Sequence, residues 1–223
     1  LTQGQLAALV TVSVLGGAIG MVASPHVARR MGKKYGAIFM YTSALTIGVA
    51  PIVLRLMGWM PANGTPELFA ILMVETLINT AFAGGTAVLL VSMVADVIED
   101  AEVKTGRRSE GLLMSADNLV KKMVSGVGVF ISGTILAFIA FPENAKRGQV
   151  DPEIIHNMGL IYLPVIGVLF GLGIVSLSFF NIDKAKHEDN LARLAERSGA
   201  PRPNPEPEPA PEPPAASPQP FKA

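Results

Sequence analysis

The chain has 223 residues, of which 50% are hydrophobic and 16% are charged, and its 18 basic and 18 acidic residues give a formal net charge of zero. It contains no cysteine, which excludes disulfide bonds and thiol chemistry. Mean hydropathy is positive although the C-terminal end is strongly polar, so the apolar residues are concentrated in the rest of the chain.

Five apolar segments are long enough to cross a membrane, because a helix needs about 20 mostly apolar residues to span the hydrocarbon core. We therefore predict an all-α, polytopic membrane helix bundle over residues 1–181. Glycines recur inside the spans, where small residues let helix backbones approach closely, and they predict a compact bundle. The predicted spans cover about residues 6–27, 37–57, 68–95, 112–141 and 160–180.

The first two connections differ in charge. Residues 26–36, HVARRMGKKYG, are predicted to form a tight basic connection, and residues 58–67 form a linker rich in Pro, Gly and Asn. Residues 95–111, ADVIEDAEVKTGRRSEG, are too dense in charge to enter a bilayer and are predicted to form a loop.

Lys and Arg collect in alternate connections, and the positive-inside rule places those connections in the cytoplasm. On this basis residues 29–35, residues 96–111 and the tail are cytoplasmic, and residues 58–67 and 142–157 lie outside.

The C-terminal part of the chain divides in two. Residues 182–197 show weak helical periodicity and predict a short amphipathic helix beside the membrane. Residues 198–223 are rich in proline and cannot bury enough surface to fold, so we predict a disordered tail, more often solvated than partner-binding. At the other end, the chain begins with Leu1 and a span follows almost at once without signal-peptide features, so we expect a C-terminal piece of a longer protein.

Ionisable side chains inside a span are expensive, and each is a functional hypothesis. Lys122 lies roughly 15 Å along its helix from the start of the span, which is the middle of a core about 30 Å thick. It has no acid three or four positions before it, so its counter-charge must come from another helix or a ligand. Asp117 and Lys121 have the spacing of an ion pair within the helix, and a structural role for them is as favoured as a functional one.

Polar residues accompany these charges at helical spacing. Asn118 and Ser125 share a helix face with Lys122, and on the third span Glu75 and Asn79 also share a face. A water-filled path between the two helices would explain both stripes. Hydrogen bonds that only hold helices together are the alternative, which we favour for Asn79 and leave open for Glu75.

Other chemistries find no support in the sequence. The segment MGKKYG lacks the first glycine of a phosphate-binding loop, and no Ser or Thr follows its lysines. The three histidines are scattered without metal-ligand spacing. We expect no metal site, no cofactor and no nucleic-acid partner.

The segments MVADVIEDAEVKTGRRSEG and ARRMGKKYG resemble the loops between helices ten and eleven and between helices eight and nine of the glycoside-pentoside-hexuronide:cation symporters. These are carriers of the melibiose type in the major facilitator superfamily. The resemblance implies that the five spans correspond to helices 8 to 12 and that helices 1 to 7 are missing partners. It also implies a sugar-type substrate and Na⁺ or H⁺ as coupling cation.

The family's coupling lysine on helix eleven falls on Lys122, with Asn118 one turn before it. The helix-ten tryptophan of melibiose carriers is Ala87 here, which argues against a melibiose-like substrate.

We therefore expect part of a secondary active transporter in the plasma or inner membrane, surrounded by lipid, that moves a sugar or glycoside with a cation by alternating access. The alternatives are a carrier of lipids or other amphiphiles, a membrane-embedded enzyme and a non-transporting scaffold. The charges at the cytoplasmic ends of the spans are interpreted as a gate. They are Asp96, Glu99, Lys104, Arg107, Arg108, Glu110, Arg29, Arg30 and Lys33.

Overall fold

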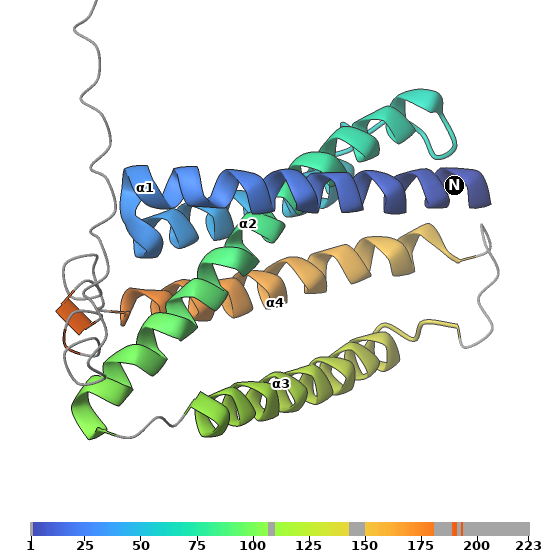
Figure 1. Ribbon diagram of the computed structural model, residues 1–223. Helices are drawn as coiled ribbons and strands as arrows, with labels where there is room; N and C mark the ends of the chain where they lie inside the picture. Colours follow the sequence, from blue (N-terminus) through green and yellow to red (C-terminus); the bar gives the residue numbers. More distant parts are fainter. Residues whose placement is uncertain (1, 107–109, 143–149, 181–188, 191–192, 194–223) are drawn as a thin grey trace, which may run out of the picture.

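The computed structural model describes residues 2–106, 110–142, 150–180, 189, 190 and 193. Its elements within these residues are four α-helices, and no strand occurs among them. They are α1 (Gln3–Leu56), α2 (Pro66–Thr105), α3 (Glu110–Phe138) and α4 (Pro152–Ser178), shown in Figure 1. All four are long and apolar enough to cross a membrane. The predicted all-α membrane bundle is confirmed.

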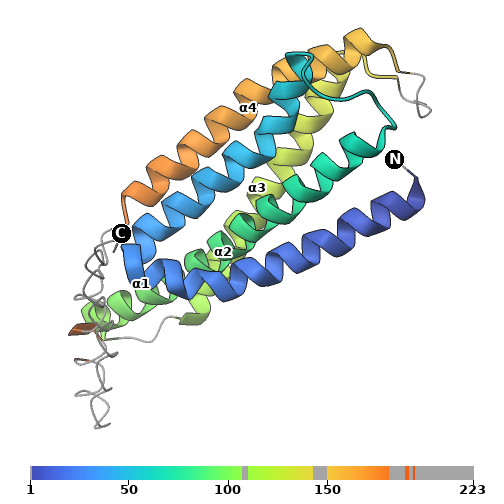
Figure 2. The ribbon, with the colours of Figure 1, turned by 90° about the horizontal axis from the view of Figure 1, so that it is seen from above.

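The five predicted spans fall on four helices because α1 contains the first two. Only Gly32 leaves the helical conformation, with φ of 78° and ψ of 160°, a region that residues with a Cβ rarely adopt. The chain reverses at Gly32, and residues 3–31 and 33–56 form two legs that diverge from this point (Figure 2). The predicted tight connection over residues 26–36 thus contains the reversal, but it is shorter than expected: the residues on both sides of Gly32 are helical, since Ala, Arg, Met and Lys all favour helix and one glycine suffices for the turn.

The charged segment after residue 95 is also helical for most of its length, which corrects the predicted loop. α2 continues to Thr105 and ends at Gly106, whose left-handed φ of 68° accompanies an N–H bond to the Glu102 carbonyl. The segment lacks Gly and Pro before that point, and Lys104 pairs with Asp100 one turn away. At 40 residues α2 is about 60 Å long, twice the thickness of the hydrocarbon core, so it projects beyond the bilayer.

The last helix begins earlier than predicted. Asp151 caps α4 by accepting a hydrogen bond from the Glu153 N–H at 2.9 Å, and Pro152 occupies the first helical position. The helix therefore starts within the predicted outer connection. Of the predicted helix over residues 182–197 only residues 189, 190 and 193 are described, and these are helical. The tail over residues 198–223 lies outside the described residues.

Glycines set the contact between α1 and α2. A Cβ on Gly16 would overlap Leu77 and Thr80 of α2, and a Cβ on Gly20 would overlap the Ala81 carbonyl. The two backbones thus touch directly, as small residues permit in membrane helices. The predicted close packing is confirmed at this crossing.

A small core lies near the reversal of α1. Ala37 and Met40 of α1 pack against Leu89 and Met93 of α2, and Leu177 of α4 adjoins them. The reversal, the C-terminal ends of α2 and α4 and the start of α3 lie at one end of the molecule (Figure 1). This matches the predicted alternation of connections. In contrast, α3 lies apart from α1 and has no buried residue.

Proline occurs inside the first leg of α1, where its missing N–H frees a carbonyl. Pro25 removes the bond that the Met21 carbonyl would otherwise accept. The fully buried Ser24 hydroxyl donates to that carbonyl at 3.0 Å. A neighbouring side chain thus satisfies the backbone, which is how membrane helices tolerate proline.

Candidate functional site

A buried ion pair joins α1 to α2 just after the reversal. The Lys33 Nζ lies 2.7 Å from Asp96 Oδ1 and 2.9 Å from Oδ2. The Asp96 side chain is only 3% exposed, and that of Lys33 is 31% exposed. Both residues were predicted as gate charges, but the sequence did not indicate that they pair with each other.

The next residue binds a different helix. The Lys34 Nζ donates to the Ser178 carbonyl at 2.7 Å, at the C-terminal end of α4. A cation is favourable there because carbonyl groups at a helix C-terminus carry partial negative charge. Sequence reasoning missed Lys34, since a backbone carbonyl acceptor leaves no signal in the residue pattern. Consecutive lysines after Gly32 therefore fasten α1 to both α2 and α4.

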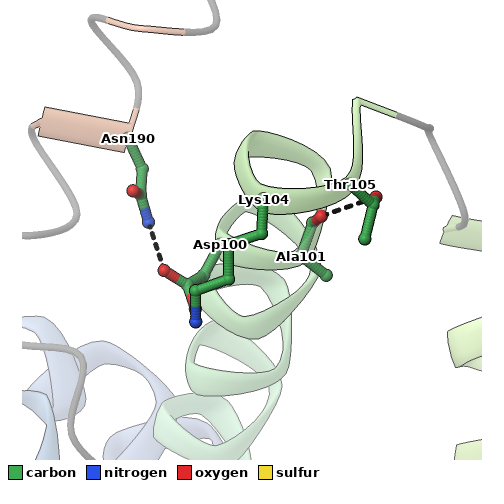
Figure 3. A network of polar contacts seen from close by, with 5 residues as sticks. All are labelled: Asp100, Ala101, Lys104, Thr105 and Asn190. Carbon is green, nitrogen blue, oxygen red and sulfur yellow. Dashed lines mark hydrogen bonds and ion pairs between the residues drawn. The ribbon is translucent and has the colours of Figure 1, made fainter.

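A second polar cluster lies on the extension of α2 (Figure 3). Asp100 accepts from the Lys104 ammonium at 2.6 Å and from the Asn190 side-chain amide at 3.3 Å. Thr105 donates to the Ala101 carbonyl at 2.8 Å. Because Asn190 is buried, a residue beyond α4 packs on the part of α2 that projects from the membrane.

The remaining predicted gate residues are dispersed. Arg29 and Arg30 are exposed at the end of the first leg of α1, and Glu99 is half-buried on α2. Glu110 lies in the first turn of α3. Arg107 and Arg108 lie outside the described residues.

Within the span, Asn79 of α2 bonds to α1 rather than to α3. Its Nδ2 donates to the Ala44 carbonyl at 2.7 Å. A Cβ on Gly48 of α1 would lie 2.6 Å from this Asn79 nitrogen. This is the interhelical hydrogen bond that the sequence favoured for Asn79. Glu75 is half-buried one turn earlier and accepts from the Thr76 hydroxyl at 3.4 Å.

The predicted residues of α3 are all on one exposed helix. Asp117 and Lys121 form the expected ion pair at i,i+4. Lys122, Asn118 and Ser125 are exposed, and no described residue pairs with Lys122. Asn79 is bonded to α1, and the path between α2 and α3 stays a prediction.

No three His, Asp or Glu side chains among the described residues lie together in a way that could hold a metal ion. What the residues do provide is a bundle of long apolar helices with ion pairs at one end and ionisable groups inside the spans. These features define a membrane-embedded helical bundle of the kind found in transporters.

Comparison with known proteins assigns the family. The family model described as MFS/sugar transport protein matches residues 2–184, and the chain belongs to this family. The chain is therefore an integral membrane protein of the major facilitator superfamily, and its resemblance to the glycoside-pentoside-hexuronide:cation symporters is confirmed at this level.

Three curated relatives cover most of this chain. The isoprimeverose transporter of Lactiplantibacillus pentosus is 28% identical over 167 residues, which are 74% of this chain and 32% of the relative. The "Putative sulfoquinovose importer" of Salmonella typhimurium is 25% identical over 80% of this chain and 35% of its own length. An uncharacterised symporter of Bacillus subtilis, YjmB, is 26% identical over 81% of this chain and 36% of its own length. The chain thus spans about a third of the length of these relatives. No solved structure matches it.

Proposed function

We propose that this chain is the C-terminal half of a secondary transporter that moves a sugar or glycoside across the membrane together with Na⁺ or H⁺. The observation that carries the proposal is the family match over residues 2–184, with relatives named as a transporter, an importer and a symporter. Because the chain spans about a third of those relatives, transport would be an activity of the longer protein. Helices 1 to 7 would then come from outside the chain.

On this proposal the two legs of α1 are helices 8 and 9 of the major facilitator fold, and α2, α3 and α4 are helices 10, 11 and 12. Two features support this order. The helix ends alternate between the two ends of the molecule, and the motifs that resemble the family's cytoplasmic loops fall at one and the same end. Alternating access would come from rocking of this bundle against the other around a site at mid-membrane.

Lys122 would be the central charge of the site, with Asn118 and Ser125 beside it. An ammonium at mid-membrane costs several kcal/mol unless it is paired or hydrated, so a retained one is expected to have a partner. No described residue provides one. We infer that Lys122 pairs with carboxylates of the other bundle, or with the ligand and its coupling cation, during the cycle.

The charges between α2 and α3 would act on conformational exchange rather than on the ligand. Arg107 and Arg108 follow α2 in the sequence and Glu110 begins α3, and on this proposal the loops of the two bundles meet there as they rock. Lys33 and Asp96 pair within this bundle, so we assign them to holding its end together rather than to contact between bundles.

The test is uptake by the complete carrier in proteoliposomes. Radiolabelled glycosides, isoprimeverose and sulfoquinovose among them, would be offered with a Na⁺ gradient, a proton gradient or neither. We expect one substrate to accumulate only with one of the cation gradients, and Lys122→Ala to abolish that accumulation.

A carrier of lipids or other amphiphiles is the second candidate, and Ala87 favours it. This small, exposed side chain stands where melibiose carriers have a sugar-stacking tryptophan. In the same proteoliposomes, movement of a fluorescent lipid between leaflets without sugar uptake under any gradient would select this candidate.

We also propose that the reversal of α1, the segment between α2 and α3 and the C-terminal tail face the cytoplasm of the plasma or inner membrane. The clustering of Lys and Arg in these segments supports this orientation. Single cysteines at Ser109 and Asn144 can be probed in intact cells, since the native chain has none. An impermeant thiol reagent should label the cysteine at 144 and spare the one at 109, and the opposite pattern would reverse the orientation.

A further inference from the structure

An apolar groove follows the first leg of α1. It is lined by Ala18, Ile19, Val22, Ala23, His26 and Val27, and almost all of its lining atoms are apolar. The glycines at 16 and 20 mark the face of this leg that packs against α2, and Val27 at the edge of the groove packs against the core there. The exposed side of the groove is formed by Ala18, Ile19, Val22 and His26.

Two arginines continue the groove at the end nearer the reversal. Arg29 and Arg30 follow His26 by three and four positions, so they lie one helical turn beyond it, on either side of the line that the His26 side chain continues along the helix. Both are exposed, and neither has an ion pair with any described residue. They differ in this from Lys33 and Lys34, which are engaged by Asp96 and by the end of α4.

We propose that the groove and these arginines bind one anionic phospholipid, with an acyl chain along the groove and the phosphate between Arg29, Arg30 and His26. From Ala18 to Arg29 the helix rises about 16 Å. That is close to half of a hydrocarbon core about 30 Å thick, the depth that an acyl chain covers from the headgroup to the midplane. Guanidinium groups bind phosphate oxygens in a bidentate manner, which gives the arginine pair a preference for a phosphate headgroup.

The charge pattern favours lipid over a protein helix as the occupant. A helix lying in the groove would need carboxylates at the level of both arginines and an apolar surface above them. A phospholipid has this arrangement in every molecule. The basic end of the groove lies at the end proposed to be cytoplasmic, where anionic lipids collect and attract Lys and Arg. The inference does not depend on the transported substrate.

The experiment uses the complete carrier and native mass spectrometry with added phosphatidylglycerol or phosphatidylcholine. We expect Arg29→Gln with Arg30→Gln to weaken phosphatidylglycerol binding by about tenfold or more, with phosphatidylcholine binding unchanged. Ala23→Leu fills the groove without a change in charge and should also reduce phosphatidylglycerol binding. Lys104→Gln is the matched control, since it removes an exposed cation elsewhere on the molecule and should leave binding unaltered.

Three results would overturn the proposal. The first is undiminished phosphatidylglycerol binding in the double arginine variant, whose exposed positions do not put folding at risk. The second is full phosphatidylglycerol binding in a folded Ala23→Leu variant, which would reduce the effect to general surface charge. The third is efficient cross-linking of a cysteine at Val22 to another helix of the carrier, which would show that protein covers the groove.

Discussion

The ion pair between Lys33 and Asp96 allows a quantitative test of how the end of the bundle is held. Lys33→Met removes the ammonium from a carboxylate whose side chain is only 3% exposed. When one partner of a buried ion pair is removed and the other stays buried and charged, the free energy of unfolding falls by about 3–5 kcal/mol. Asp96→Asn instead leaves the lysine, which is 31% exposed and can turn toward water, so we expect a loss of only about 1 kcal/mol.

A double variant separates charge from packing. With Lys33→Met and Asp96→Leu together no charge remains, and replacement of a buried pair by apolar residues is often neutral or stabilising. The double variant should therefore recover most of the loss of Lys33→Met. Lys104→Met should cost less than Lys33→Met, because the Lys104 side chain is 65% exposed and Asp100 keeps the Asn190 amide as a donor.

The free energies of unfolding can be compared by detergent-induced unfolding of the purified complete carrier in mixed micelles. The reasoning fails if Lys33→Met and Asp96→Asn lose equal stability. It also fails if the double variant is less stable than Lys33→Met, because the loss would then come from packing at the reversal rather than from a buried charge.

Three further predictions concern the spans. Lys122→Met should keep or raise thermal stability while cation-driven uptake collapses, whereas Lys121→Ala should lower stability or expression more than coupling; the reverse pattern would exchange their roles. Gly20→Ala should lower stability by about 1–3 kcal/mol, because the added Cβ would meet the backbone of α2. Gly167→Ala places its Cβ in open space and should stabilise α4 by up to about 1 kcal/mol. Thermal unfolding measures both changes. Asn79→Ala should cost about 0.5–1 kcal/mol and leave uptake intact, and loss of uptake at normal stability would place Asn79 in the substrate path instead.

Hydropathy predicted which parts of the chain are apolar enough to cross a membrane, but not where the helices end. A bilayer limits the apolar stretch, whereas a helix continues until a residue adopts a backbone conformation outside the helical region. This is why α2 runs through the charged residues to Gly106. It is also why α1 continues on both sides of Gly32 and departs from the helical conformation at that residue alone.

The candidate site was predicted unevenly, for a physical reason. Side-chain pairs on one helix are visible as a spacing, and the pair of Asp117 and Lys121 was found in that way. Lys33 and Asp96 are 63 positions apart, and their pairing depends on how two helices cross. Asn79 was recognised as a helix-joining residue, but its acceptor is the Ala44 carbonyl, a group that every residue possesses.

The contacts that hold the helix ends together limit where this bundle can change shape. Lys33 and Lys34 hold α2 and α4 to the reversal of α1, beside a small apolar core, so this end should move as one block. No residue of α3 is buried, and Lys122 and the apolar Phe130 are both exposed on it. Hydrocarbon can surround Phe130 at no cost, but it cannot surround Lys122 without a cost of several kcal/mol. We therefore expect the face of α3 that carries Lys122, Asn118 and Ser125 to meet a polar surface, which none of the described residues supplies. We expect that contact, rather than the fastened end, to change during alternating access.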